Sequence, residues 1–282
     1  MPARRKWRSS CTGIRDSEGA VVIIPTYNER ENLDRLVSSV LATIPDIRLL
    51  VVDDNSPDGT GELADQLAAG DPRVKVLHRP RKQGLGTAYA AGFDYAIAAG
   101  YAFIVQMDGD FSHRAVDLPR LIAAVQDADV AIGSRNVRGS QVVGWSPLRH
   151  LVSRVGSFYA RLMLGLPIRD CTSGFKCFRR SALAALDRTQ LRANGYAFQV
   201  EVSYACARAG LRIVEVPIVF PDRALGKSKM TPRIVLEAAL LVLRLRFRSA
   251  PGAPVTGALT QGRTTPAVPV QDASNRDLAR PA

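Results

Sequence analysis

The sequence predicts an α/β protein with a mostly parallel central sheet flanked by helices. Two observations lead to this class. Over residues 21–113, short apolar runs typical of strands buried on both faces alternate with segments whose apolar residues recur at helical spacing. Polar loops follow three of the runs directly, at residues 25–32, 53–60 and 108–113. Because this alternation is the pattern of parallel strands joined by crossover helices, the three loops are expected to meet at one edge of the sheet.

The first half of the chain is expected to supply alternating strands and helices. Strands are predicted at residues 21–24, 49–52, 74–77 and 102–105, and helices after Asn28, at 60–69 and at 87–99. The side chain of Asn28 can cap the first helix, and Glu29 and Glu31 suit the positive end of its dipole. The face of this helix that packs on the sheet is predicted to consist of Leu33, Leu36, Val37, Val40 and Leu41.

The second half is expected to continue the alternation with longer polar loops. Strands are predicted at residues 130–132, 175–178 and 211–220, helices at 148–164, 181–187 and 198–209, and a loop over 137–150. A polar turn at 170–176 precedes the 175–178 strand, and a basic loop rich in small residues follows residue 220.

The two ends of the chain are predicted to be disordered tails. Residues 1–20 are basic and residues 249–282 are rich in Pro, Ala, Gly, Thr and Gln, and neither stretch has a period. One folded domain is therefore predicted over 21–230, followed by an amphipathic helix at 231–248. The apolar part of that helix, 234–243, is shorter than the roughly 20 residues that span a bilayer. Two alternatives stay open for it: packing on the domain, or contact with a membrane surface through its arginines.

Composition places the chain among soluble globular proteins, with 282 residues, 46% hydrophobic and 23% charged. The net charge of +12 suits an anionic substrate, an acidic membrane surface or nucleic acid, although an unspecific basic surface explains it as well. No stretch resembles a zinc finger, a basic zipper region or an aromatic RNA-binding motif, so nucleic acid is not expected as a partner.

Cysteine usage indicates a cytoplasmic protein. No apolar signal sequence is recognised near the start, so the four cysteines are expected to be thiols and not disulfides. None has C-x-x-C spacing, and we interpret all four as packing residues: Cys11, Cys171, Cys177 and Cys206. The histidines are scattered, which gives a histidine-based metal site little support.

A pair of carboxylates, Asp108 and Asp110, follows the strand at 102–105 with Gly109 between them. This spacing lets both side chains turn toward one hard cation, and Mg²⁺ or Mn²⁺ accepts such oxygens while leaving positions for substrate phosphates. An ordinary Asp-Gly turn is the alternative. The residues of the neighbouring loops are needed to distinguish a metal site from an ordinary turn.

A nucleotide site is the natural hypothesis for the sheet edge where the polar loops meet. The dinucleotide-binding version is disfavoured, because Pro25, Thr26 and Tyr27 follow the first strand where a G-x-G-x-x-G fingerprint would stand. No G-x-x-x-x-G-K-[ST] motif occurs either, which excludes a P-loop. The glycine-containing segment 81–87 is explained adequately as a turn that starts a helix.

With these loops in view, the chain resembles the family-2 glycosyltransferases of the GT-A fold, and among them the dolichyl- or polyprenyl-phosphate mannose synthases. The matching segments occur in the family's order and are residues 25–32, 52–60, 84–89, 107–113, 133–135, 173–175, 222–223 and 226–229. Any one segment is modest evidence, but the ordered set is highly specific.

The resemblance implies a GDP-mannose donor, Mg²⁺ or Mn²⁺, and a polyprenyl monophosphate acceptor at the membrane. It implies a nucleoside pocket lined by Pro25, Tyr27, Glu29, Val52 and Asp54, and a metal and diphosphate site made by Asp108, Gly109 and Asp110 with Ser112 near the metal. It further implies donor or acceptor phosphate contacts by Arg135, Arg223 and Lys229, and acceptor-phosphate contacts by Arg149 and Ser153. Asp110, Arg135 and Arg223 would act most directly in catalysis.

The resemblance also implies a location and leaves rivals open. Many family members append membrane-spanning helices, so docking of this chain is expected to rest on the 231–248 helix, on basic surface or on a membrane-protein partner, at the cytoplasmic face of a membrane. A phosphate acceptor is already an anion near neutral pH, so no strong general base is expected. Direct attack would give a β-linked product from an α-linked donor. The rivals are a polyprenyl-phosphate glucosyl- or N-acetylglucosaminyltransferase and a non-catalytic nucleotide-sugar sensor or membrane scaffold.

Overall fold

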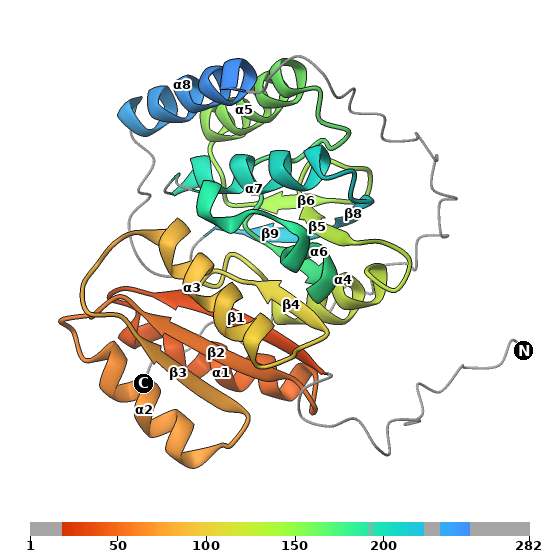
Figure 1. Ribbon diagram of the computed structural model, residues 1–282. Helices are drawn as coiled ribbons and strands as arrows, with labels where there is room; N and C mark the ends of the chain where they lie inside the picture. The colour runs from red at the N-terminus through yellow and green to blue at the C-terminus, as the bar shows by residue number, and fades with distance from the viewer. Residues whose placement is uncertain (1–18, 192, 194, 223–231, 249–282) are drawn as a thin grey trace, which may run out of the picture.

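The computed structural model describes residues 19–191, 193, 195–222 and 232–248 (Figure 1). In this part of the chain a seven-stranded sheet has the order β3-β2-β1-β4-β7-β5-β8, and β6 and β9 form a separate two-stranded sheet. The strands are β1 Ala20–Thr26, β2 Arg48–Asp53, β3 Val74–His78, β4 Phe103–Gln106, β5 Val130–Ser134, β6 Gln141–Val143, β7 Lys176–Arg179, β8 Ile213–Pro217 and β9 Val219–Pro221. All neighbours in the large sheet are parallel except β7, which runs antiparallel to both β4 and β5. The prediction of a mostly parallel sheet is confirmed.

Helices cover both faces of the large sheet (Figure 1). The helices of the described residues are α1 Arg30–Thr43, α2 Thr60–Gly70, α3 Leu85–Ala98, α4 Leu118–Ala124, α5 Pro147–Leu164, α6 Arg180–Ala185, α7 Tyr196–Arg208 and α8 Pro232–Arg248, with short 3₁₀ turns at Ala115–Asp117 and Arg188–Gln190. Alternate residues of β1 belong to the two hydrophobic cores, one on each face of the sheet. Val21 and Ile23 pack with α3 and α7, whereas Val22 and Ile24 pack with α1 and α4. Because both faces of such a strand are covered, its sequence is a continuous apolar run.

The order of the strands places the predicted loops side by side. β1 lies between β2 and β4, and all three run parallel, with Thr26 opposite Asp53 and Ile23 opposite Gln106. Their carboxyl ends therefore open on one edge of the sheet, as the alternation of strand and helix predicted.

Asn28 does not cap α1, and that prediction is wrong. Glu29 stands at the N-cap position and no side chain of its own helix caps the turn. Instead, the loop after β2 and the first residue of α2 supply the acceptors. Thr60 Oγ1 accepts from the Glu29 backbone N–H at 3.0 Å, and Asp58 Oδ2 accepts from that of Arg30 at 3.3 Å. The start of α1 is thus fixed by a loop about 30 residues away, which a local pattern does not reveal.

Two further predictions need correction. The single strand expected over 211–220 is two strands, because β8 pairs with β5 while β9 pairs with β6 in the small sheet. The segment 137–150, expected to be a loop, contains β6 and the start of α5. The expected tails fall almost wholly on residues 1–18 and 249–282, which lie outside the described residues.

Candidate active site

Backbone and side-chain contacts tie the three loops together at the carboxyl edge of β1, β2 and β4. Thr26 Oγ1 donates to Asp53 Oδ1 at 3.0 Å, which joins the ends of β1 and β2. Gly109, after β4, sits so close to the β1 loop that an added Cβ would lie 3.6 Å from both Pro25 O and Glu29 Cγ. The structure therefore brings together the predicted nucleoside-side residues Pro25 and Glu29 and the Asp108–Asp110 turn.

The two predicted metal ligands lie on this turn in different surroundings. Asp108 Oδ1 accepts from the Tyr89 hydroxyl at 2.9 Å, and its side chain remains partly exposed. Asp110 is buried, and its Oδ1 accepts from both the backbone N–H and the hydroxyl of Ser112. The residue between Asp110 and Ser112, Phe111, has a left-handed backbone with φ of 61°, which turns the chain so that Ser112 reaches back to the carboxylate.

The donor set of this turn fits a hard divalent cation. Asp108 and Asp110 supply carboxylate oxygens and Ser112 a hydroxyl, which keeps two lone pairs while it donates to Asp110. No group of three or more His, Cys, Asp and Glu side chains that could hold a metal occurs among the described residues. Mg²⁺ and Mn²⁺ suit such a sparse oxygen set, because in phosphate-handling sites they bind one or two carboxylates plus substrate oxygens.

Asp54, predicted for the nucleoside pocket, anchors the loop before α3. It is buried, forms an ion pair with Arg79, and accepts from the backbone N–H groups of Gln83 and Gly84 at 3.2 Å each. Gly84 is the N-cap of α3 with φ of 100°, so the glycine-containing segment is a helix-start turn, as expected. Asp54 thereby fixes the position of the loop before α3.

Tyr27 and Val52, the other predicted nucleoside contacts, differ in accessibility. Tyr27 is half-buried, and Lys82 Nζ lies 3.7 Å from the centroid of its ring. The Val52 side chain is completely buried in the core under α3. Their contacts with a nucleoside stay predictions.

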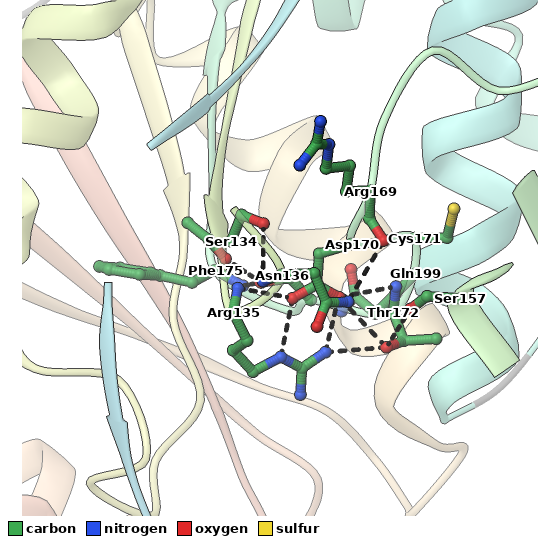
Figure 2. Close-up of polar contacts among 12 residues, drawn as sticks. Ser134, Arg135, Asn136, Ser157, Arg169, Asp170, Cys171, Thr172, Phe175 and Gln199 are labelled. Atoms are coloured by element: carbon green, nitrogen blue, oxygen red, sulfur yellow. Dashed lines mark hydrogen bonds and ion pairs between the residues drawn. The ribbon is translucent and has the colours of Figure 1, made fainter. Parts of the chain in front are cut away.

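Arg135, predicted to bind phosphate, forms a two-pronged ion pair with Asp170 (Figure 2). Its Nε and Nη2 atoms lie 2.8 and 2.7 Å from the two Asp170 oxygens, and Nη2 also donates to Thr172. Burial on its own would raise the pKa of Asp170, but the charge and hydrogen bonds of Arg135 outweigh it and hold that pKa below its usual value. The contact of Arg135 with a substrate phosphate stays a prediction.

A polar cavity of about 250 Å³ lies between the end of β5 and the first half of α5. Its lining is Arg135, Asn136, Ser140, Val142, Trp145, His150, Ser153 and Arg154. The structure thus brings Arg135 and Ser153 together. Arg149, on the same helix, is held by Asp222 at 2.6 Å and stacks over Trp145. Arg223 and Lys229 lie outside the described residues.

Three residues that frame the site were not predicted. His113 packs on Phe175 with ring centroids 4.8 Å apart, and its Nδ1 accepts from the Asp108 N–H at 3.0 Å. Burial lowers the pKa of His113, which favours the neutral imidazole that this acceptance requires. Asp170 and Tyr89 are the other two, and both belong to segments noted in the sequence, the polar turn 170–176 and the motif 84–89. The partners of Tyr89 and Asp170 are Asp108 and Arg135, which lie in loops 19 and 35 residues away, and no local pattern encodes these pairings.

The outer face of α5 is an exposed apolar surface. Leu148, Leu151, Val155, Phe158 and Leu162 recur at alternating spacings of three and four and are 55–69% exposed, while the same helix buries Ser157 and Ala160. α8 packs beside α5 at the end of the molecule farthest from α2, and it adds exposed Leu236, Leu240 and Phe247 (Figure 1). We call these eight side chains the α5–α8 apolar face. Within the described part of the chain, no helix combines the length and apolar character needed to cross a bilayer.

The fold and the carboxylate turn define the class of protein. Residues 21–187 match glycosyl transferase family 2, and the chain belongs to this family. Its sheet and flanking helices have the GT-A arrangement, shared at a TM-score of 0.56 and 17% identity with a mannosyltransferase from Pyrobaculum calidifontis solved with GDP-Man and Mn²⁺, over 84% of this chain and 66% of that one.

Two curated relatives are much more similar in sequence. The chain is 49% identical over 224 residues to the undecaprenyl-phosphate mannosyltransferase of Micrococcus luteus, covering 79% of this chain and 92% of that protein. It is 46% identical over 237 residues to the polyprenol monophosphomannose synthase of Mycolicibacterium smegmatis, covering 83% and 89%. The resemblance drawn from the ordered segments is confirmed.

Proposed function

We propose that this protein transfers mannose from GDP-mannose to a polyprenyl monophosphate of the dolichyl type, with inversion, to give a polyprenyl β-mannosyl phosphate. The observation that carries the proposal is the Asp108–Asp110 turn lying against the β1 loop at Pro25 and Glu29, at the edge where GT-A proteins bind nucleotide sugars. Identities of 49% and 46% to proteins named for this transfer support the choice of sugar and acceptor. We assign the chemistry to residues 21–230 and membrane contact to 231–248 together with α5.

The leaving group of this reaction is a nucleoside diphosphate, whose charge grows as the bond to the sugar breaks. Asp108 and Asp110, with Ser112, would hold Mg²⁺ or Mn²⁺, which when bound acts as a Lewis acid toward the diphosphate. Asp54 and Arg79 keep the loop before α3 in place on the nucleoside side. Arg223 and Lys229 remain proposed phosphate contacts on the strength of their motif.

The acceptor needs orientation more than activation. A phosphate monoester has its second pKa at about 6, so its oxygen is already nucleophilic at neutral pH and no strong general base is needed. The polar cavity beside α5 is our candidate for its phosphate, because Ser153, Arg154 and Arg135 line it and Arg149 lies one helical turn before Ser153. Inversion requires a phosphate held there to approach the sugar from the side opposite the diphosphate.

The α5–α8 apolar face supports a peripheral position on the cytoplasmic side of a membrane. Monomeric proteins rarely expose an apolar stripe of this kind without a partner. The exposed arginines Arg154, Arg161, Arg244 and Arg246 lie on the same two helices and suit lipid phosphates. The enzyme has to bind its lipid acceptor at a membrane surface of this kind. The first half of α5 also lines the cavity that we propose for the acceptor phosphate.

A donor panel tests the proposal. Purified protein is given polyprenyl phosphate with Mg²⁺ or Mn²⁺ and, in turn, radiolabelled GDP-mannose, UDP-glucose and UDP-N-acetylglucosamine. We expect label in the lipid only from GDP-mannose. Transfer from a UDP-sugar would favour the rival sugar specificities, and donor binding without any transfer would favour a sensor or scaffold.

A further inference from the structure

The Tyr89 hydroxyl donates to Asp108 Oδ1 from inside the protein. Tyr89 lies on α3, is completely buried, and its oxygen is 2.9 Å from the carboxylate. Its segment, 84–89, matched the family in sequence without any role being assigned to the tyrosine. The proposed ligand Asp108 is therefore attached to α3 through this hydrogen bond.

The tyrosine ring is held rigidly. It stacks on Phe198 of α7 with the planes 2° apart and the centroids at 6.0 Å, and on Phe93 of its own helix at 6.2 Å. Gly86 allows α3 to approach α7 this closely, since an added Cβ would lie 2.9 Å from Phe198. The hydroxyl therefore has a fixed position relative to the sheet.

The direction of this hydrogen bond is also fixed. A protonated phenol donates and an ionised carboxylate accepts. The contact thus holds the Asp108 carboxylate through its Oδ1 atom.

Two other residues, His113 and Gly174, lie next to Asp108. Its backbone N–H donates to His113, and Gly174 leaves room for the carboxylate, since a Cβ added at Gly174 would lie 3.2 Å from Oδ2. The carboxylate is thus bounded on one side by Tyr89 and on another by Gly174. Rotation of the side chain would break the bond to Tyr89.

We propose that Tyr89 is a positioning residue that orients the Asp108 carboxylate for the divalent cation and donor diphosphate. The inference rests on the proposed function, because that function gives Asp108 its role. Residues that hydrogen-bond to metal ligands typically change metal affinity by about 10- to 100-fold when they are replaced.

Mn²⁺ binding tests the inference without any turnover. Free Mn²⁺ is followed by EPR while it is titrated into protein saturated with GDP, for wild type, Tyr89→Phe and the control Tyr159→Phe. The control removes a hydroxyl that donates to the Ala239 carbonyl at 3.3 Å, between α5 and α8 and away from the turn. We expect Mn²⁺ affinity to fall by about 10- to 100-fold in Tyr89→Phe and to stay unchanged in Tyr159→Phe.

Wild-type affinity in a folded Tyr89→Phe protein would overturn the inference and leave the proposed function intact. Failure of the wild type itself to bind Mn²⁺ with GDP would overturn both. A second measurement needs no substitution: ¹³C-tyrosine is introduced at position 89 alone, or at 159 alone, and NMR spectra are recorded with Mn²⁺ and GDP. We expect strong paramagnetic broadening at 89 and little at 159, whereas a sharp signal from Tyr89 would contradict its contact with a metal ligand.

Discussion

Arg135 and Asp170 are joined by two parallel hydrogen bonds in the interior of the protein. The Asp170 side chain is 0% exposed and that of Arg135 is 6% exposed, and the Asp170 carboxylate also accepts from the Arg135 backbone N–H at 2.9 Å. Glu215 in turn accepts from the backbone N–H groups of Arg169 and Asp170 at 2.8 and 2.9 Å. The pair therefore joins the end of β5 to the turn before β7 and to β8.

Replacing Asp170 is expected to destabilise the fold strongly. Asp170→Asn leaves the guanidinium of Arg135 buried without its counter-charge, and breaking a buried pair in this way costs about 3–5 kcal/mol. Urea denaturation measures the change. Asp94→Asn is the matched control: it breaks the exposed pair with Arg188 at 2.8 Å, which is worth less than about 1 kcal/mol. Equal losses in the two variants would mean that the Arg135–Asp170 pair is not an anchor.

Because Lys176 is buried, the free energy of unfolding should rise as the pH becomes alkaline. Burial lowers the pKa of Lys176 from 10.5 to about 8. Between these values the unfolded chain holds the proton and the folded chain does not, so the free energy of unfolding rises with pH across this window. At about 1.4 kcal/mol per pKa unit the gain is about 3 kcal/mol. We expect wild type to gain this much relative to Lys176→Met between pH 8 and 10.5 in urea denaturation, and parallel curves would contradict the assignment.

The buried cysteines should be chemically inert in the native protein. Cys171, Cys177 and Cys206 are buried and free, which confirms them as packing residues, whereas Cys11 lies outside the described residues. Burial raises the pKa of Cys171 and of Cys206 to about 12, and that of Cys177 is raised further. Since the thiolate is the reactive form, a Cys11→Ser protein should react with Ellman's reagent only after denaturation. Rapid reaction of any native thiol would contradict the buried packing.

The α5–α8 apolar face should control membrane binding without affecting stability. Phe158 is 63% exposed, so Phe158→Glu should change the free energy of unfolding by less than about 0.5 kcal/mol. Burying a phenylalanine in lipid is worth about 1.5–3 kcal/mol, so sedimentation with anionic liposomes should weaken by about 10- to 100-fold. Val116→Glu is the control, because Val116 is similarly exposed, at 56%, but lies on the turn before α4. Equal binding by both variants would remove the membrane role of α5.

The sequence predicted the parts of the fold that local patterns encode. The runs at 21–24 and 49–52 became β1 and β2, and the gathering of their loops with Asp108 and Asp110 followed from parallel order alone. The direction of β7 was not predictable, since the residues of so short a strand look the same in either orientation. The break at Ile218 between β8 and β9 was missed because its cause is pairing with β6, far away in the chain.

Side-chain partners were the least predictable part of the site. Arg135 was expected to meet phosphate, and nothing local shows that Asp170, 35 residues later, holds its guanidinium. The helix expected over 148–164 is present as α5, but the expectation did not say which of its faces packs inward. In α5 the small residues Ser157 and Ala160 are inside and Leu151 and Phe158 outside.

The transfer assay with Asp110→Ala tests the central claim most directly. Mannosyl transfer from radiolabelled GDP-mannose to polyprenyl phosphate is measured over a Mn²⁺ series for wild type, Asp110→Ala and Glu62→Ala, an acidic residue in the first turn of α2 that serves as control. We predict that Asp110→Ala abolishes transfer at every Mn²⁺ concentration while Glu62→Ala behaves as wild type. Near-normal, metal-dependent transfer by folded Asp110→Ala protein would contradict the account.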